Sequence, residues 1–527
     1  MVGNLMPIIE THETPDKAPL WVLETRNTAY VIGWSHTDGL YHIYWGAKLT
    51  RSGDYRPAPG FDAEVKMTRS ARGEFPAWGN FKFDEPCLKV RFDDGVRAVL
   101  LDYVDSTIHE DDGTATLAIR LRDPVYPLAV TLTYRVFREF NLIERSARLE
   151  NTGQHPIEIE QILSAAWRLP RRDSYTLTTL NGKWGGEFQI QRGDLPMGKH
   201  VVERRRGSSG FDSNPFFALG ADGSATETHG EVWFGALAFS GNYKLVIERT
   251  AYEQVSVTGG IHDFDFLWRL EPGERFDTPV FVGGFTEHGY GDASRLLHAY
   301  ELEHVLPRVT AKTVRPVVYN SWFVTEFNVN YENQTRAAEL AARMGVELFI
   351  MDDGWFGQRR DDRAGLGDWY VNKQKFPNGL TPLIDKVNEL GMEFGIWVEP
   401  EMVNPDSDLY RAHPDWVYHF PNRPLSMHRN QYVLNLSRQD VQAFILHFMH
   451  DLLANHNIKF IKWDMNRHFS EPGWHDAPEG RDRELWVRHT TGLYDIFREL
   501  REQHPGGLLE SSSGGRGRID LGIMAYI

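Results

Sequence analysis

Two patterns of hydrophobic and polar residues divide the chain near residue 290. Over the first part, apolar and polar positions alternate in short runs, among them residues 88–92, 96–101, 131–137, 143–149 and 255–257. Alternation with a period of two is typical of strands that bury one face. Turn-forming pairs separate the runs at Asp112-Gly113, Asn181-Gly182 and Pro272-Gly273. The pattern predicts one large antiparallel β-sandwich, or supersandwich, over residues 1–290.

The pattern changes after a helical stretch at residues 293–303. Short apolar runs then end in polar or aromatic residues, at 317–322, 348–355, 394–399, 432–436, 460–466 and 508–513. Segments with helical periodicity separate these runs. Six successive β/α units favour a (β/α)8 barrel over an open sheet, although spacing alone does not exclude a doubly wound fold. We therefore expect a helical linker at 291–315 and the first six β/α units of a barrel, incomplete in this chain, at 316–527.

Polar residues near the predicted helix ends suggest where two of these helices begin. Asn333 is expected to cap a helix that ends at Gly345. Ser437 with Asp440 fits the capping-box spacing ahead of a long amphipathic run.

Composition narrows the function classes. Hydrophobic residues make up 41% of the chain and charged residues 25%, and no apolar run approaches the roughly 18 residues of a membrane span. The net charge of −16 disfavours nucleic acid and anionic membranes as partners and favours a neutral substrate. A single cysteine, Cys87, excludes an internal disulfide and a cysteine-cluster metal site. These features predict a cytoplasmic enzyme.

The run at 460–466 contains the strongest catalytic candidate. Its period of two puts Lys462, Asp464 and Asn466 on one face, toward the mouth of the barrel. An ionised carboxylate held there suits a glycosidase nucleophile. A structural Lys–Asp pair that closes the strand end is the alternative.

Two adjacent acids, Asp352 and Asp353, end the run at 348–355. They could bind a metal, act as an acid/base pair or accept hydrogen bonds from a polyhydroxylated ligand. Neighbouring strand residues point to opposite faces, so the two acids cannot form a close pair unless the strand has ended, which Gly354 permits. A solvated Asp-Asp-Gly turn is the alternative.

Other strand ends have residues suited to binding a sugar. Trp322 and Trp397 could stack on the ring while Arg429 and Lys462 donate to hydroxyl groups, although each tryptophan alone is as well explained by packing. The glycine-serine loop at 510–518 lacks the spacing of a phosphate-binding motif and instead permits close approach of the backbone to a ligand.

Taken together, these stretches make the sequence resemble glycoside hydrolase family 36, the bacterial α-galactosidases. The matching stretches follow the order of the family over nearly the whole chain: Glu74-Phe75-Pro76-Ala77-Trp78-Gly79, Asn214-Pro215-Phe216-Phe217-Ala218, Met351-Asp352-Asp353-Gly354-Trp355, Gly367-Asp368-Trp369, Trp397-Val398-Glu399-Pro400-Glu401-Met402, Arg429-Asn430-Gln431, Lys462-Trp463-Asp464-Met465-Asn466-Arg467 and the loop at 510–518.

The resemblance implies a retaining glycosidase that releases terminal α-galactose from oligosaccharides such as melibiose and raffinose. Asp464 would be the nucleophile. The implied sugar contacts are Trp322, Asp352, Asp353, Trp397, Arg429, Lys462, Ser512 and Gly514. Family members use no metal or organic cofactor, and many form homotetramers in which a loop of the amino-terminal domain reaches a neighbouring pocket. Residues 51–73 match that loop too loosely for any residue to be assigned.

Two departures from the family pattern matter. Ser512 stands where cysteine is usual, so discrimination near the 2-hydroxyl group is an open question. The family places its acid/base in a Ser-Asp-Asn-Thr-Asp stretch on the next barrel strand, which residues 1–527 do not contain, and we expect the sequence to be part of a longer protein. Asp520, expected on the helix after the loop, is a poor substitute. An α-N-acetylgalactosaminidase, a galactosyl-transferring relative and a non-catalytic sugar-binding fragment are the alternatives.

Overall fold

The computed structural model describes residues 8–13, 17–55, 73–79 and 83–527, so most of the loosely matched stretch 51–73 lies outside the described residues. The chain divides into two compact units. The first comprises Met1–Arg205, Phe211–His304 and Asp520–Gly522, and the second Arg206–Gly210, Val305–Ile519 and Ile523–Ile527.

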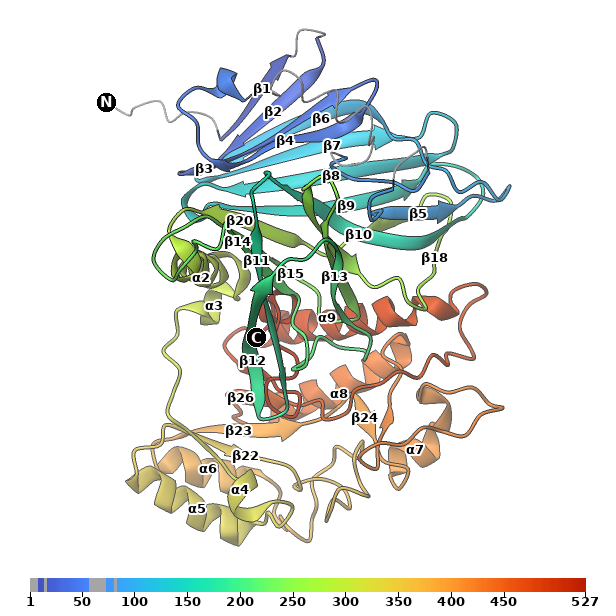
Figure 1. Cartoon of the computed structure of the whole chain (residues 1–527). Helices are drawn as coiled ribbons and strands as arrows, with labels where there is room; N and C mark the ends of the chain where they lie inside the picture. The colour runs from blue at the N-terminus through green and yellow to red at the C-terminus, as the bar shows by residue number, and fades with distance from the viewer. Residues whose placement is uncertain (1–7, 14–16, 56–72, 80–82) are drawn as a thin grey trace. The chain divides into compact units, whose positions relative to one another are not determined.

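The first unit is built from antiparallel sheets, as predicted. Within the described residues, one sheet has the order β1 (Ile9–Glu13), β2 (Pro19–Glu24), β3 (Thr28–Ser35), β4 (Gly39–Ala47). The largest sheet has the order β12 (Gly186–Asp194), β11 (Tyr175–Lys183), β14 (Phe216–Ala221), β15 (Val232–Leu237), β20 (Phe281–Thr286), β9 (Leu142–Asn151), β8 (Leu128–Phe137), β7 (Thr114–Arg122), β6 (Asp102–Asp111), with β19 (Arg275–Asp277) on β9. A third has β13 (Gly198–Arg204), β16 (Tyr243–Arg249), β17 (Val255–Ile261), β10 (Ile157–Leu169) and β18 (Trp268–Leu270), with β5 (Leu88–Arg91) on β10. Figure 1 shows β6 to β9 as one broad layer.

Two sequence expectations fail locally in this unit. Residues 96–101 form no strand, because β5 pairs with β10 instead of with the chain that follows it. Asn181-Gly182 lies inside β11, not in a turn. A Cβ at Gly182 would lie 2.4 Å from the carbonyl oxygen of Gly186, so the glycine permits close approach of β12. The turns at Asp112-Gly113 and Pro272-Gly273 form as predicted.

A parallel sheet organises the second unit. Its order is β21 (Val318–Asn320), β22 (Leu348–Met351), β23 (Glu393–Val398), β26 (Phe460–Trp463), β27 (Leu508–Ser511). The predicted strand at 432–436 is absent from this sheet: β25 (Tyr432–Val433) pairs antiparallel with β24 (Met402–Val403). Among the described residues the sheet therefore has five strands, and the strand that precedes Asp464 is its fourth, not its fifth.

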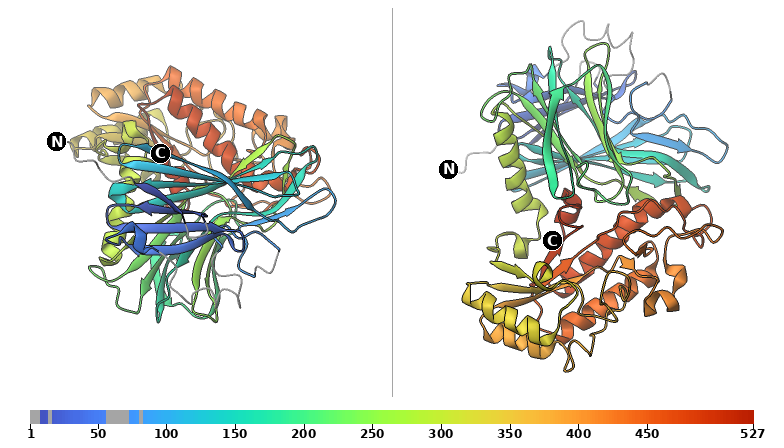
Figure 2. Two further views of the ribbon diagram at one scale, coloured as in Figure 1. Left: turned by 90° about the horizontal axis from the view of Figure 1, so that it is seen from above. Right: turned by 60° about the horizontal axis from the view of Figure 1, so that its bottom comes forward.

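Helices connect and cover these strands. They are α2 (Gly289–Tyr300) in the first unit, followed by a π-helical turn (Glu301–Val305), and α3 (Arg308–Ala311), α4 (Trp322–Thr325), α5 (Tyr331–Arg343), α6 (Thr381–Glu389), α7 (Asp408–Ala412), α8 (Gln439–Asn455), α9 (Leu485–Gln503) and α10 (Leu521–Met524). Short 3-10 turns occur at Ser52–Asp54, Arg138–Phe140, Pro414–Trp416 and Asp482–Glu484. Helices α8 and α9 lie side by side (Figures 1 and 2). In the described parts of the chain, no helix has both the length and the apolar character required to cross a bilayer.

Both predicted helix caps differ from the observed ones. Asn330, not Asn333, caps α5, and Asn333 is its reciprocal partner three residues later. Helix α8 begins after Arg438 with no side-chain cap: the Ser437 hydroxyl lies 3.1 Å from that of Tyr418, and the Asp440 carboxylate is bound by the Arg438 guanidinium. In α5 the asparagine predicted as the cap therefore lies three positions after the observed cap, because either asparagine fits the sequence pattern of a helix start.

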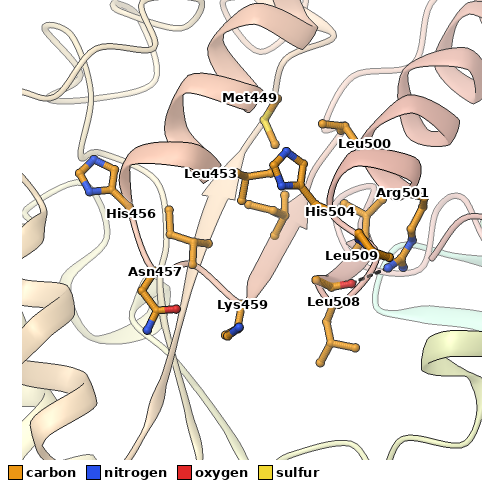
Figure 3. A pocket seen from close by; sticks show the side chains of 15 residues that line it. Met449, Leu453, His456, Asn457, Lys459, Leu500, Arg501, His504, Leu508 and Leu509 are labelled. Atoms are coloured by element: carbon orange, nitrogen blue, oxygen red, sulfur yellow. Dashed lines mark hydrogen bonds between the residues drawn. The ribbon is translucent and has the colours of Figure 1, made fainter.

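A cavity of about 270 Å³ lies at the amino-terminal ends of β26 and β27 (Figure 3). Met449 and Leu453 come from α8, Arg501 comes from α9, and Lys459 precedes β26. The polar residues predicted to carry chemistry stand at the opposite, carboxyl ends of the strands. In parallel α/β folds that is where active sites are built, so this cavity is not the candidate site.

Candidate active site

The register of the parallel sheet brings the predicted residues to one level. Val398 of β23 pairs with Trp463 of β26, and Trp463 pairs with Ser511 of β27. The residues that follow these strand ends, including Asp464 and Ser512, therefore share one rim. The backbone N–H of Asp464 still donates to the carbonyl oxygen of Val398 at 2.8 Å, which extends the ladder to the site.

Asp464 is 6% exposed and receives two hydrogen bonds at each oxygen. The N–H groups of Met465 and Gly514 donate to Oδ1 at 3.0 and 3.1 Å. Trp397 Nε1 and Asn466 Nδ2 donate to Oδ2 at 3.1 and 2.7 Å. Donors on both oxygens hold the carboxylate in one orientation, a requirement for attack on a fixed carbon atom.

Lys462 contacts Asp352, not Asp464. Its Nζ lies 2.8 Å from Asp352 Oδ2, which also accepts from Asn320 Nδ2 at 2.6 Å. The structural Lys462–Asp464 pair considered from the sequence is therefore wrong. Burial lowers the pKa of the Lys462 ammonium, but the charges of Asp352 and Asp464 outweigh burial and hold this pKa above its ordinary value.

Asp353 forms a buried ion pair with Arg359. Arg359 Nη2 lies 2.7 Å from Asp353 Oδ2, and Nε lies 2.9 Å from Oδ1. Asp352 and Asp353 are 3% and 5% exposed, so the solvated-turn interpretation is wrong. Strand β22 ends at Met351, ahead of both acids, and Gly354 has φ +109°. A Cβ at Gly354 would lie 2.7 Å from the Phe327 carbonyl oxygen. Because the strand has ended, the two acids turn to different cations.

The predicted aromatic and arginine contacts differ in how they relate to Asp464. Trp397 is buried, donates to Asp464, and its ring is nearly parallel to that of Phe356 at 6.2 Å. Trp322 is half-buried at the start of α4, and its backbone N–H donates to Asn320 Oδ1 at 2.9 Å. Arg429 is exposed in a turn with φ +53°, and it makes no hydrogen bond or ion pair with the Asp464 cluster among the described residues.

The glycine-serine loop reaches Asp464 through its backbone. Gly514 has φ +60°, a conformation favourable to glycine, and this aims its N–H at Asp464 Oδ1. Ser512 is 5% exposed, and its N–H donates to the Trp463 carbonyl oxygen at 2.7 Å. The hydroxyl oxygen of Ser512 accepts from the Gly515 N–H at 3.4 Å. The loop is thus fixed at both its strand end and its glycine end.

Sequence reasoning did not assign roles to several buried charges around this cluster. Glu399 and Glu401, each 1% exposed, follow β23. Burial and the charge of Asp464 raise the pKa of Glu399 to about 8. Burial also raises the pKa of Glu401, but Arg518 and His489 outweigh it and hold that pKa at about 2. The stretch Trp-Val-Glu-Pro-Glu after a strand was the available signal for both acids.

These contacts define what the cluster can do. Two cations each neutralise one acid, while Asp464 is held by uncharged donors and has no cation within ion-pair distance among the described residues. A carboxylate of this kind, beside buried charged groups that can meet hydroxyl groups, is suited to nucleophilic attack on the anomeric carbon of a bound sugar.

The chain matches two known families over most of its length. The Melibiase family matches residues 275–527, and the glycosyl hydrolase family 36 N-terminal domain matches residues 38–271. Alpha-galactosidase AgaA of Geobacillus stearothermophilus is 38% identical over 530 residues, which cover 96% of this chain and 72% of AgaA. Alpha-galactosidase Mel36A of Lactobacillus acidophilus is 34% identical over 537 residues, covering 97% and 73%.

Solved structures agree with these matches. The crystal structure of GH36 α-galactosidase AgaA from G. stearothermophilus superposes with a TM-score of 0.92 at 38% identity, covering 96% of this chain and 74% of that one. The α-galactosidase from Lactobacillus brevis gives a TM-score of 0.92 at 30% identity, covering 98% and 72%. The relatives align across both units of the chain at identities of 30 to 38%. The chain belongs to glycosyl hydrolase family 36.

Proposed function

We propose that the cluster around Asp464 performs the retaining step of an α-galactosidase. Asp464 attacks the anomeric carbon and forms a covalent galactosyl intermediate, which water then hydrolyses. The observation that supports this role most directly is the pair of donors on each Asp464 oxygen. They hold the nucleophile in place, so little orientational entropy is lost when the substrate arrives.

The substrate is an oligosaccharide with a terminal α-linked galactose, such as melibiose or raffinose. Variants of the relative AgaA have been crystallised in complex with stachyose and with raffinose. In this chain we assign hydroxyl recognition to Asp352, Asp353 and Lys462, and the pocket wall to Trp322 and Trp397. We assign Ser512 and Gly514 to the side of the sugar pocket that the glycine-serine loop forms. We still assign Arg429 as a hydrogen-bond donor to the sugar, which its side chain would reach from an exposed turn.

No residue of this chain is assigned as the general acid. Retaining enzymes place the two carboxyl groups about 5 to 5.5 Å apart. Asp520 stands just before α10, and its Oδ1 accepts hydrogen bonds from Ser240 Oγ and the Gly522 N–H, both at 2.8 Å. Asp520 therefore caps a short helix. The acid/base that the resemblance implies, in a Ser-Asp-Asn-Thr-Asp stretch, stays a prediction.

A fluoride leaving group gives a direct test, because it departs without protonation and reports on the nucleophile alone. Incubation with 5-fluoro-α-galactosyl fluoride is expected to yield one covalent adduct, which peptide mass spectrometry assigns to Asp464. The matched variant Asp464→Asn should form none. An adduct on another residue, or sugar binding with no adduct in the parent protein, would contradict the proposal and favour a binding protein.

Comparison of two chromogenic substrates tests the sugar preference. We expect release from nitrophenyl α-galactoside to exceed release from its 2-acetamido analogue. The buried Ser512 is the departure that makes the second substrate worth testing. Turnover of the 2-acetamido substrate alone would make the protein an α-N-acetylgalactosaminidase.

Two further assignments complete the proposal, the first based on the family resemblance and the second on the composition of the chain. We assign a homo-oligomeric state, with a tetramer as the expected size, and light scattering on the eluted protein measures it directly. We assign a cytoplasmic location, and cell fractionation with activity assays of each fraction tests it.

A further inference from the structure

A second buried carboxyl group, Glu399, stands behind the nucleophile. It follows β23 and is 1% exposed, and its Oε1 accepts the backbone N–H of Asn466 at 2.5 Å. The side chain of Asn466 in turn donates to Asp464 Oδ2 at 2.7 Å. Glu399 thus connects to the nucleophile through one residue, and it does not itself contact Asp464.

The other oxygen of Glu399 faces a side chain with an unmatched acceptor. Gln431, 2% exposed, lies 3.0 Å from Glu399 Oε2 through its amide nitrogen, and its amide oxygen is buried without a hydrogen-bond partner among the described residues. The two ends of a glutamine amide have the same shape and can exchange places. The exchange would let a protonated Glu399 Oε2–H donate to Gln431 Oε1, and it would place the two N–H donors of Gln431 where the unmatched oxygen now lies.

The surrounding charges favour the same protonation state. The charged groups acting on Glu399 are Asp464, Asp353 and Arg359, and Arg359 is already engaged by Asp353 at 2.7 Å. Ionised Glu399 would therefore add a second buried negative charge near Asp464. Burial and the Asp464 charge raise the pKa of Glu399 to about 8.

We propose that Glu399 is a positioning residue that works in its protonated form: it donates to Gln431, accepts from the Asn466 backbone, and thereby holds the Asn466 carboxamide on the nucleophile Asp464. The proposal rests on the assignment of Asp464 as the nucleophile. It adds a pH limit, because loss of the Glu399 proton places a second anion close to Asp464, although the Gln431 amide nitrogen can still donate to the ionised carboxylate.

The test is the rate at which 5-fluoro-α-galactosyl fluoride labels Asp464, followed from pH 5 to 10. In the parent protein the labelling rate should fall with a midpoint near pH 8 as Glu399 ionises. The neutral variant Glu399→Gln should label within about threefold of the parent at pH 6, a difference below about 0.7 kcal/mol of barrier, and should lack this alkaline limb. Glu399→Ala, which leaves the Asn466 N–H unpaired, should label about 10- to 100-fold more slowly.

Asp495→Asn is the control, since Asp495 pairs with Arg498 on the surface, where both side chains are more than half exposed. Loss of this carboxylate should leave the alkaline midpoint where it is in the parent. An unchanged alkaline limb in folded Glu399→Gln would overturn the proposal. So would a loss of more than about 100-fold at pH 6, which would mean that the ionised form is needed.

A spectroscopic readout separates this proposal from the assignment of Asp464. Infrared difference spectra between pH 6 and 9 should contain the C=O band of one protonated carboxyl group that Glu399→Gln lacks. In Asp464→Asn the same band should disappear at a lower pH, because the neighbouring negative charge is gone. If the parent protein is not labelled at all, the nucleophile assignment fails; if the band is missing, the Glu399 proposal fails.

Discussion

The buried ion pair between Glu401 and Arg518 should be the largest electrostatic contribution to the stability of the site. The substitution Glu401→Gln tests this contribution. Arg518 Nη1 donates to Glu401 Oε2 at 3.0 Å, and Nη2 lies 2.9 Å from Oε1. Trp463 Nε1 donates to Oε1 at 2.8 Å. The two charged side chains are 1% and 2% exposed. One carboxylate thus ties together the segment after β23, strand β26 and the glycine-serine loop.

The size of the effect follows from the pKa of Glu401. An ordinary glutamate has a pKa of 4.5, and that of Glu401 is about 2. The difference of roughly 2.5, at about 1.36 kcal/mol per unit, corresponds to about 3 kcal/mol in favour of the charged native form. Removing one member of a buried pair costs about 3 to 5 kcal/mol because the other charge stays buried. We expect Glu401→Gln to lower the free energy of unfolding at pH 7 by about 3 kcal/mol.

The pH dependence gives the sign. Because the native pKa of Glu401 is lowered, its stabilisation is complete above about pH 4.5 and is lost as the pH falls toward 2. The parent protein should therefore lose more stability between pH 5 and 3 than Glu401→Gln does. Urea unfolding followed by tryptophan fluorescence at several pH values measures both effects, with the slope on urea serving as a check that the same surface unfolds.

Asp495→Asn is the matched control, since Asp495 pairs with Arg498 on the surface, where both side chains are more than half exposed. Exposed pairs contribute little to stability, so this variant should unfold close to the parent. A loss of less than about 1 kcal/mol in Glu401→Gln, or a pH profile parallel to that of the parent, would refute the reasoning.

Two other substitutions should act on single contacts of the site. Trp397→Phe removes one hydrogen-bond donor to Asp464. A hydrogen bond to a charged group contributes about 1.5 to 3 kcal/mol, so labelling of Asp464 by the fluoride substrate should slow by about tenfold or more. Circular dichroism should show that the variant keeps its fold. Lys462→Gln removes the cation that pairs with buried Asp352. In the Asp464→Asn background this change should weaken galactose binding, measured by calorimetry, by more than it slows the labelling of Asp464 when it is made alone. Unchanged galactose binding would contradict the assignment of Lys462 to hydroxyl recognition.

The sequence was most informative about which strand ends carry chemistry. A period of two over residues 460–466 separates Lys462, Asp464 and Asn466 from their apolar neighbours, and all three lie at the site in the structure. The parallel order also follows from the alternation of strand-like and helix-like segments, since each crossover brings the next strand end to the same rim. Local periodicity, together with the parallel order of the strands, is sufficient to predict at which end of the sheet the site lies.

Pairing between distant residues was beyond the reach of the same reasoning. Lys462 binds Asp352, 110 positions away, although Asp464 is much closer in sequence. Tyr432 and Val433 likewise pair antiparallel with β24, and the sequence did not predict this because a two-residue strand is too short to indicate which sheet it joins. Arg429 precedes β25 in the connection between these two strands, and its exposed position could not be read from its polarity.

The balance of charge explains why so many acids can gather at one rim. Lys462 compensates Asp352, Arg359 compensates Asp353, and Arg518 compensates Glu401. Among the described residues, Asp464 and Glu399 have no cation within ion-pair distance, and ionising both is costly because they share a buried site. Asp464 has four donors directed at its oxygens, whereas Glu399 accepts only from the Asn466 N–H and the Gln431 amide nitrogen, and its pKa is raised. The hydrogen-bond pattern therefore places the negative charge on Asp464, the residue that must attack.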